Sequence, residues 1–133
     1  MFGIEDLTIQ KFFVLTLNDD NRTALANYLE GISTIAITSS SPLNIEVMDQ
    51  YGNKGSALKK VAEHYNIPLH NTVAIGDNFN DIPMLEVAGL SVAMGNAEPQ
   101  VKEICDVVTQ SNAEDGVAYA INNHVLTTIQ AKQ

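Results

Sequence analysis

Residues 73–81 read Val-Ala-Ile-Gly-Asp-Asn-Phe-Asn-Asp, and this stretch decides how the rest of the chain is interpreted. A short apolar run of the kind found in buried strands leads directly into Gly76 and Asp77, and a helix signal follows within four residues. In a parallel α/β sheet, ligands bind beside the carboxyl ends of the strands. We therefore expect Asp77 at a site-forming edge, with Asp81 near the start of the following helix.

The polar side chains of this stretch form a set of hard oxygen donors. Asp77 and Asp81 supply carboxylates, and Asn78 and Asn80 supply amide oxygens. Such a set suits Mg²⁺, which takes one or two protein carboxylates and keeps water or substrate phosphate as its other ligands. The same residue types also cap helices. The spacing alone leaves both interpretations open.

The sequence from Asn53 onward alternates helix and strand signals. Short connections between strand, helix and strand predict a parallel sheet of the α/β class. The expected helices are 54–65, 80–88, 98–105 and 115–127, and the expected strands are 72–75, 91–94 and 106–109.

The first fifty residues have a different pattern, β-α-β-β. We expect strands at 12–17, 34–38 and 44–49 and an amphipathic helix at 20–30 that stops at Gly31. Residues 39–42 read Ser-Ser-Ser-Pro, which predicts a turn between the last two strands. The change of pattern places a domain boundary at residues 51–53.

Lys54 opens the first helix after this boundary, in the sequence Gly-Asn-Lys-Gly-Ser of residues 52–56. A helix N-terminus with flanking glycines and a lysine suits a phosphate group. The stretch is not a P-loop, because the pattern GxxxxGK[ST] is absent. A solvated lysine is the plain alternative.

Composition excludes several classes of partner. The 133 residues carry a net charge of −9, with 16 acidic against 7 basic residues and Arg22 as the only arginine, so we expect no nucleic-acid partner. No apolar run approaches the ~18 residues that span a bilayer, so we expect no membrane segment. The acidic N-terminus and the single Cys105 favour the cytoplasm. His64, His70 and His124 lack metal-ligand spacing.

Four separated motifs together resemble a known family. They are Asn53–Leu58, Gly76–Asp81, Val92–Ala97 and Glu114–Ala118. Their order and spacing are similar to the C-terminal part of Cof-type sugar-phosphate phosphatases of the haloacid dehalogenase (HAD) superfamily. The resemblance implies that residues 53–133 are the C-terminal half of a Rossmann-like core, and that residues 1–52 are a remnant of an α+β cap domain.

The resemblance also implies roles for individual residues. Lys54 would be the catalytic lysine that contacts nucleophile and phosphate, and Asn80 would hydrogen-bond the phosphate. Asp77 would bind Mg²⁺ directly, and Asp81 would hold metal-bound water or orient the site. The substrate implied is a small phosphorylated metabolite. The loop Gly95-Asn96 lies close to the site in this family, although a tight turn explains it equally well.

The sequence departs from this family at the nucleophile, which is the first Asp of an Asp-x-Asp motif. No two of the 16 acidic residues lie two positions apart. Residues 18–21, Asn-Asp-Asp-Asn, offer the nearest imitation, and we interpret them as a turn and helix cap. Residues 38–41 could imitate the family's Ser/Thr phosphate-binding motif, but a hairpin turn is the better interpretation.

Two functional hypotheses follow. In the first, the chain is the C-terminal half of a Mg²⁺-dependent HAD phosphatase and is inactive as an isolated chain, because it lacks the attacking carboxylate. In the second, it is a non-catalytic binding or assembly module. A sheet without its first strands has an open edge, which would pair with a second copy or with a separate N-terminal half.

Overall fold

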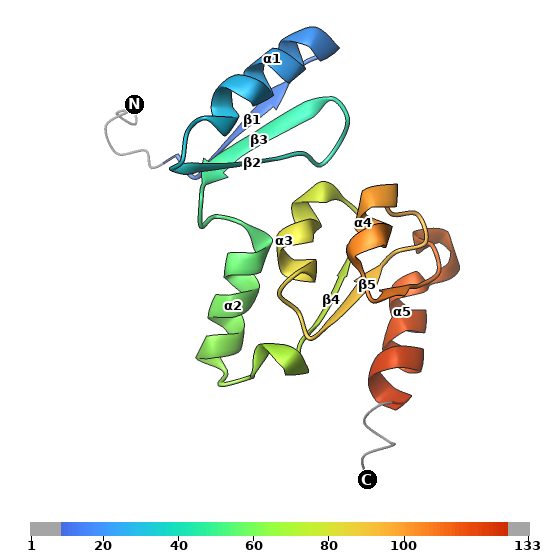
Figure 1. The fold of residues 1–133 in the computed structure, drawn as a ribbon. Helices are drawn as coiled ribbons and strands as arrows, with labels where there is room; N and C mark the ends of the chain where they lie inside the picture. Colours follow the sequence, from blue (N-terminus) through green and yellow to red (C-terminus); the bar gives the residue numbers. More distant parts are fainter. Residues whose placement is uncertain (1–8, 128–133) are drawn as a thin grey trace, which may run out of the picture. The chain divides into compact units, whose positions relative to one another are not determined.

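The computed structural model describes residues 9–127 and divides the chain into two compact units, residues 1–53 and residues 54–133. Each unit contains a three-stranded sheet of its own, antiparallel in the first and parallel in the second (Figure 1). The predicted α/β class with a parallel sheet is confirmed. No helix within residues 9–127 is both long and apolar enough to cross a membrane.

The first unit follows the expected β-α-β-β order. Its elements are β1 (Lys11–Leu15), α1 (Asp19–Glu30), β2 (Ile35–Thr38) and β3 (Asn44–Asp49). β3 is the central strand and pairs antiparallel with both neighbours. α1 begins where the side chain of Asn18 accepts a hydrogen bond from the Asn21 amide at 2.9 Å, as an N-cap does. Residues 18–21 therefore cap a helix, as their sequence predicts.

The second unit alternates helices and strands. Its elements are α2 (Lys54–His64), η2 (Leu69–Asn71), β4 (Val73–Gly76), η3 (Phe79–Asp81), α3 (Ile82–Leu85), β5 (Leu90–Ala93), α4 (Pro99–Ile104), β6 (Val107–Val108), η4 (Asn112–Glu114), α5 (Gly116–Ala120) and the π-helix η5 (Ile121–Leu126). The sheet order is β4-β5-β6, with parallel pairing throughout.

The register of this sheet brings the carboxyl ends of its strands together. Gly76, the last residue of β4, pairs with Ala93, the last residue of β5, and Ala93 pairs with Val108 of β6. The pairing continues past the strand ends, because the Met94 amide donates to the Gly76 carbonyl at 2.9 Å. The loops that leave these strands therefore start from one edge.

The core of the second unit packs small and branched side chains between the sheet and its helices. Its buried residues are Ala74, Leu85, Ala93, Met94, Ala97 and Val101. α2 packs closely on α3 because Gly55 has no side chain, and a Cβ there would lie 2.2 Å from the Pro83 carbonyl oxygen. This contact fixes the start of α2, where Lys54 lies, next to α3.

Two expected helices take a different form in the structure. The expected helix 80–88 is a 3₁₀ turn, η3, followed by the four-residue α3, and it ends before Gly89, which lies directly against the His70 backbone. The expected helix 115–127 starts one residue later, and residues 121–126 have π-helical hydrogen bonding. There the Asn123 side chain donates to the Tyr119 carbonyl at 2.9 Å, an interaction that helical spacing does not reveal.

Candidate functional site

Asp81 organises the loop that follows β4. One oxygen of its buried carboxylate, Oδ2, accepts hydrogen bonds from the amides of Asp77 at 2.9 Å and Asn78 at 3.1 Å. Asn78 caps η3 in return, which completes a capping box. Gly76 is required at this close approach, since a Cβ there would lie 2.5 Å from the Asp81 Cβ. The Gly-Asp-x-x-x-Asp spacing thus has a local structural cause.

The second oxygen of Asp81, Oδ1, forms an ion pair with the ammonium group of Lys54. The Asp81 side chain is only 6% exposed and that of Lys54 is 48% exposed. Lys54 Nζ also donates to Asn80 Oδ1 at 3.4 Å. The lysine therefore neutralises a buried carboxylate that would otherwise have amide hydrogen bonds but no opposite charge, and it remains accessible to a further anion from the solvent side.

Asp77 differs from Asp81 because its side chain is exposed. Its Oδ2 accepts a hydrogen bond from Asn96 Nδ2 at 3.2 Å, and its main-chain carbonyl accepts one from the Glu98 amide at 3.0 Å. Asn96 Oδ1 in turn accepts from the Asn112 amide at 2.9 Å. Sequence reasoning missed the contribution of both asparagines. The signals for Asn96 were the position of Gly95-Asn96 directly after a strand and the family resemblance, which places this loop close to the site.

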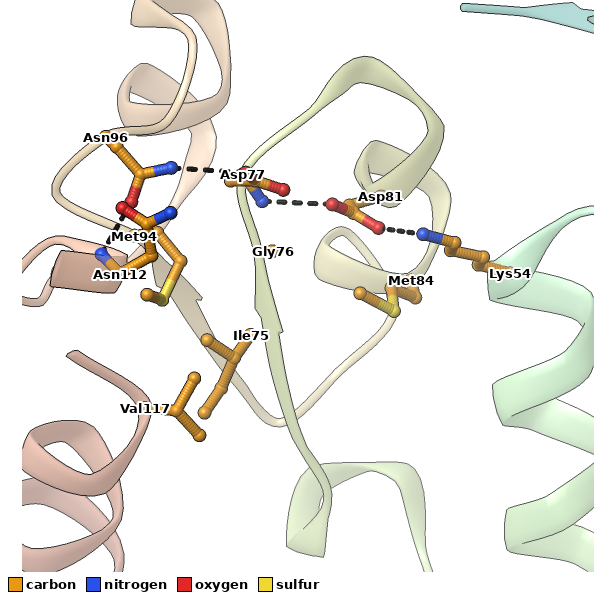
Figure 2. Close-up of a pocket in the computed structure, with 10 residues that line it drawn as sticks. All are labelled: Lys54, Ile75, Gly76, Asp77, Asp81, Met84, Met94, Asn96, Asn112 and Val117. Carbon is orange, nitrogen blue, oxygen red and sulfur yellow. Dashed lines mark hydrogen bonds and ion pairs between the residues drawn. The ribbon is translucent and has the colours of Figure 1, made fainter. Parts of the chain in front are cut away.

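These side chains border a hollow of about 580 Å³ at the carboxyl edge of the sheet (Figure 2). Polar groups line one part of it, and apolar side chains line the rest. The polar residues are Lys54, Asp77, Asp81, Asn96 and Asn112, and the apolar residues are Ile75, Met84, Met94 and Val117. The volume falls within the range of small-molecule sites, roughly 300–1,000 Å³.

The donor atoms of this edge partly fit a magnesium ion. Asp77 offers an exposed carboxylate, a hard oxygen ligand of the kind Mg²⁺ uses together with water. Both carboxylate oxygens of Asp81 already have partners, namely Lys54 and two amides. Within residues 9–127, no group of three or more His, Cys, Asp or Glu side chains is arranged to hold a metal. The chain therefore brings one open carboxylate to such an ion.

The structure brings all four predicted site residues to this edge. The carboxylate of Asp81 contacts both the Lys54 ammonium group and the Asp77 amide. Lys54 also donates a hydrogen bond to the side chain of Asn80. Their catalytic, phosphate-binding and metal-binding roles stay predictions. Arginine is absent from the site, since the single Arg22 pairs with Asp19 on α1.

The weaker candidates take structural roles. Residues 38–41 lead from β2 to β3, so the predicted hairpin turn is present, and the side chain of Ser39 bonds within the turn to Asn44 at 3.2 Å. Burial raises the pKa of the Cys105 thiol, which argues against a reactive thiolate. His64 packs edge-on against the neighbouring Tyr65 ring.

Comparison with known proteins agrees with the arrangement of these motifs. The family described as haloacid dehalogenase-like hydrolase matches residues 2–121. The chain is 48% identical over 109 residues to the 5-amino-6-(5-phospho-D-ribitylamino)uracil phosphatase YcsE of Bacillus subtilis, covering 82% of this chain and 44% of the relative. It is 45% identical over 94 residues to the phosphatase YwpJ of the same organism, covering 71% of this chain and 33% of that relative.

Solved structures of haloacid dehalogenase-like proteins also resemble this chain. A haloacid dehalogenase-like hydrolase from B. subtilis superposes with a TM-score of 0.86 at 37% identity, over 87% of this chain and 41% of that one. The HAD subclass IIB sugar phosphatase BT4131 superposes with a TM-score of 0.75 at 29% identity, over 85% and 42%. The chain thus spans less than half the length of these relatives. Because the family match runs through both units as far as the start of η5, the chain belongs to the haloacid dehalogenase-like hydrolase family.

Proposed function

We propose that this chain supplies the phosphate- and magnesium-binding half of a HAD phosphatase site that acts on small phosphorylated metabolites of the sugar-phosphate kind. The observation that carries the proposal is the arrangement at the carboxyl edge of the parallel sheet. There the accessible ammonium of Lys54 is held by buried Asp81, beside the exposed carboxylate of Asp77. The relatives, which include phosphatases and a sugar phosphatase, support the substrate class.

Each residue has a role that its surroundings support. Lys54 and Asn80 would bind the phosphate through an ammonium group and a side-chain amide. Asp77 would hold Mg²⁺ together with water, and Asp81 would keep Lys54 and the η3 loop in place. When bound, the ion neutralises negative charge on the phosphoryl group.

We further propose that the 133-residue chain alone does not turn over phosphate esters. Phosphoryl transfer in this scheme needs an attacking carboxylate, and the sequence contains no Asp-x-Asp pair. Positive charge and metal binding stabilise a transition state but do not supply the missing nucleophile.

Phosphate binding and turnover can be measured separately on the same protein. We expect orthophosphate to bind in the presence of Mg²⁺ in a ³¹P NMR titration, and Lys54→Met to weaken this binding about tenfold or more, as loss of a charge-assisted contact does. Lys59→Met, which removes an exposed lysine from the same helix, is the matched control. Hydrolysis of p-nitrophenyl phosphate that requires Mg²⁺ and disappears in Asp77→Ala would overturn the proposed inactivity of the chain.

A second candidate function is assembly with another chain. β4 is an edge strand of the parallel sheet in the described part of the protein, and its first residue, Val73, is 37% exposed. Such an edge can pair with a second copy or with a separate N-terminal half that carries Asp-x-Asp. Light scattering at high protein concentration tests self-association, and a monomer with a cooperative melt counts against it.

A further inference from the structure

Asn96 lies where three loops of the second unit meet. It follows β5, while Asp77 follows β4 and Asn112 begins η4 after β6. The close approach depends on Gly95, because a Cβ there would lie 2.7 Å from the Ser111 nitrogen. The Gly95 amide also donates to the Gln110 carbonyl at 3.0 Å. The backbone thus holds Asn96 beside the segment after β6.

The side-chain amide of Asn96 connects the other two loops. Its Nδ2 donates to Asp77 Oδ2 at 3.2 Å, and its Oδ1 accepts from the Asn112 amide at 2.9 Å (Figure 2). The two partners have opposite requirements, because a carboxylate only accepts and a backbone N–H only donates. The orientation of the amide is therefore fixed by both contacts. An aspartate at this position would place a second negative charge against Asp77.

This contact restricts a side chain that would otherwise rotate freely in solvent. The Asp77 carboxylate is exposed, and Asn96 is the donor to its Oδ2. The other oxygen of this carboxylate, Asp77 Oδ1, receives no hydrogen bond from any residue within the described range. Because the Asn112 amide donates to Asn96 Oδ1, it polarises the Asn96 amide and strengthens the bond to Asp77. One Asp77 oxygen is thus fixed, and the other is left to coordinate a cation.

We infer that Asn96 is a positioning residue that fixes the orientation of the Asp77 carboxylate and so prepares it to bind Mg²⁺. This inference rests on the proposed role of Asp77 in metal binding. Residues that hydrogen-bond to a metal ligand and so orient it typically contribute about 10- to 100-fold to metal affinity. The lower end applies here, because Asp77 and Asn96 are both exposed.

The orientation of Asp77 can be tested without any metal. In the metal-free chain, side-chain ³J couplings should report one χ1 rotamer for Asp77. Asn96→Ala should give rotamer averaging, as should Asn96→Asp, which keeps an acceptor for the Asn112 amide but removes the donor to Asp77. Gln100→Ala, at an exposed amide side chain on α4, is the control and should leave the couplings unchanged. Averaged couplings in the unmodified chain, or unchanged couplings in Asn96→Ala, would overturn the inference.

A titration with Mg²⁺ then separates this inference from the proposed function. We expect Asn96→Ala to bind Mg²⁺ about tenfold more weakly at an unchanged melting temperature. Equal affinity in the two proteins contradicts the positioning role. If the unmodified chain shows no Mg²⁺-dependent shift at Asp77 while its rotamer still depends on Asn96, the proposed metal role is wrong and the orientation of Asp77 by Asn96 stands.

Discussion

Asp81 carries a buried negative charge, and both of its carboxylate oxygens accept hydrogen bonds. Replacing one of these oxygens by a donor should therefore change the stability of the protein. Asp81→Asn keeps the shape of the side chain but turns an –NH₂ group toward either Lys54 or the amides of Asp77 and Asn78. We expect the free energy of unfolding to fall by about 1–3 kcal/mol, the cost of leaving buried polar groups unpaired. Chemical denaturation measures this change. Asp20→Asn, at an exposed first-turn residue of α1, is the comparison, and equal losses in the two variants would contradict the assigned role of Asp81.

Glu46 in the first unit is a second buried carboxylate, and its charge makes stability depend on pH. Hydrogen bonds from Lys11, at 2.7 Å, and from Ser40 lower its pKa below the ordinary 4.5. A lowered pKa stabilises the folded protein above pH 4.5, and this contribution is lost as acid protonates Glu46 in the folded state.

Lys11→Met should therefore destabilise the protein at neutral pH by about 1 kcal/mol, a modest value because the lysine is half exposed. The difference from the unmodified protein should shrink as the pH falls through the pKa of Glu46. Urea denaturation at neutral and acidic pH measures it, and Lys60→Met on α2 serves as the control. A difference that stays constant across this pH range would refute the assignment.

Among single residues, the sequence identifies those whose role follows from the strand or helix signals next to them. Asp77, Asn80 and Asp81 were predicted because they follow a strand, and Lys54 because it opens a helix. Asn96 and Glu46 were not predicted as interacting residues. Their partners are Asp77, 19 positions away, and Lys11, 35 positions away, and no local spacing encodes such distances. Only the register of the sheets brings these pairs together.

The packing of α2 on α3 depends on Gly55. Gly55→Ala places a methyl group 2.2 Å from the Pro83 carbonyl oxygen, so one of the two helices must move. We expect a loss of about 1–3 kcal/mol in the free energy of unfolding, which exceeds the gain of up to about 1 kcal/mol in helix propensity.

Gly31→Ala provides the matched control for this substitution. Gly31 ends α1 with φ −73°, and an added Cβ would meet only the Tyr28 carbonyl oxygen at 3.6 Å. Alanine fits this conformation, so stability should stay equal or rise by about 0.5 kcal/mol. Thermal denaturation of both variants checks the pair. Similar melting temperatures for the two would mean that α2 and α3 adjust without cost.

The bounds of strand β3 were predicted correctly, whereas the helices expected at 80–88 and 115–127 take a different form. β3 spans the predicted residues 44–49, because the turn signal at residues 39–42 marks where this strand can begin. The helix predicted at 80–88 is shorter, because Phe79–Asp81 form a 3₁₀ turn capped by Asn78 and α3 ends at Leu85. The change to π-helix after Ala120 and the left-handed Asp115 also arise from side-chain and backbone contacts that periodicity does not record.

In the molecule as a whole, the proposed cation site lies within a large negative net charge. Lys54 neutralises Asp81 locally, whereas the chain carries a net charge of −9 that acts over longer distances. A field of this sign would draw Mg²⁺ toward Asp77 and would repel the proposed phosphorylated substrate. Binding of the two is therefore expected to be coupled, with the metal reducing the repulsion that the phosphate meets.

The affinity for Mg²⁺ should consequently depend on ionic strength. The Debye length falls from roughly 30 Å at 0.01 M to about 8 Å at 0.15 M, so added KCl screens the attraction of the distant acidic residues. We expect the dissociation constant, measured by calorimetry, to rise by about tenfold over this range. Glu63→Gln removes one exposed acid of the sixteen and should weaken binding far less than the salt does. An affinity that does not change with salt would mean that the contacts at Asp77 alone determine binding and that the net charge contributes nothing to it.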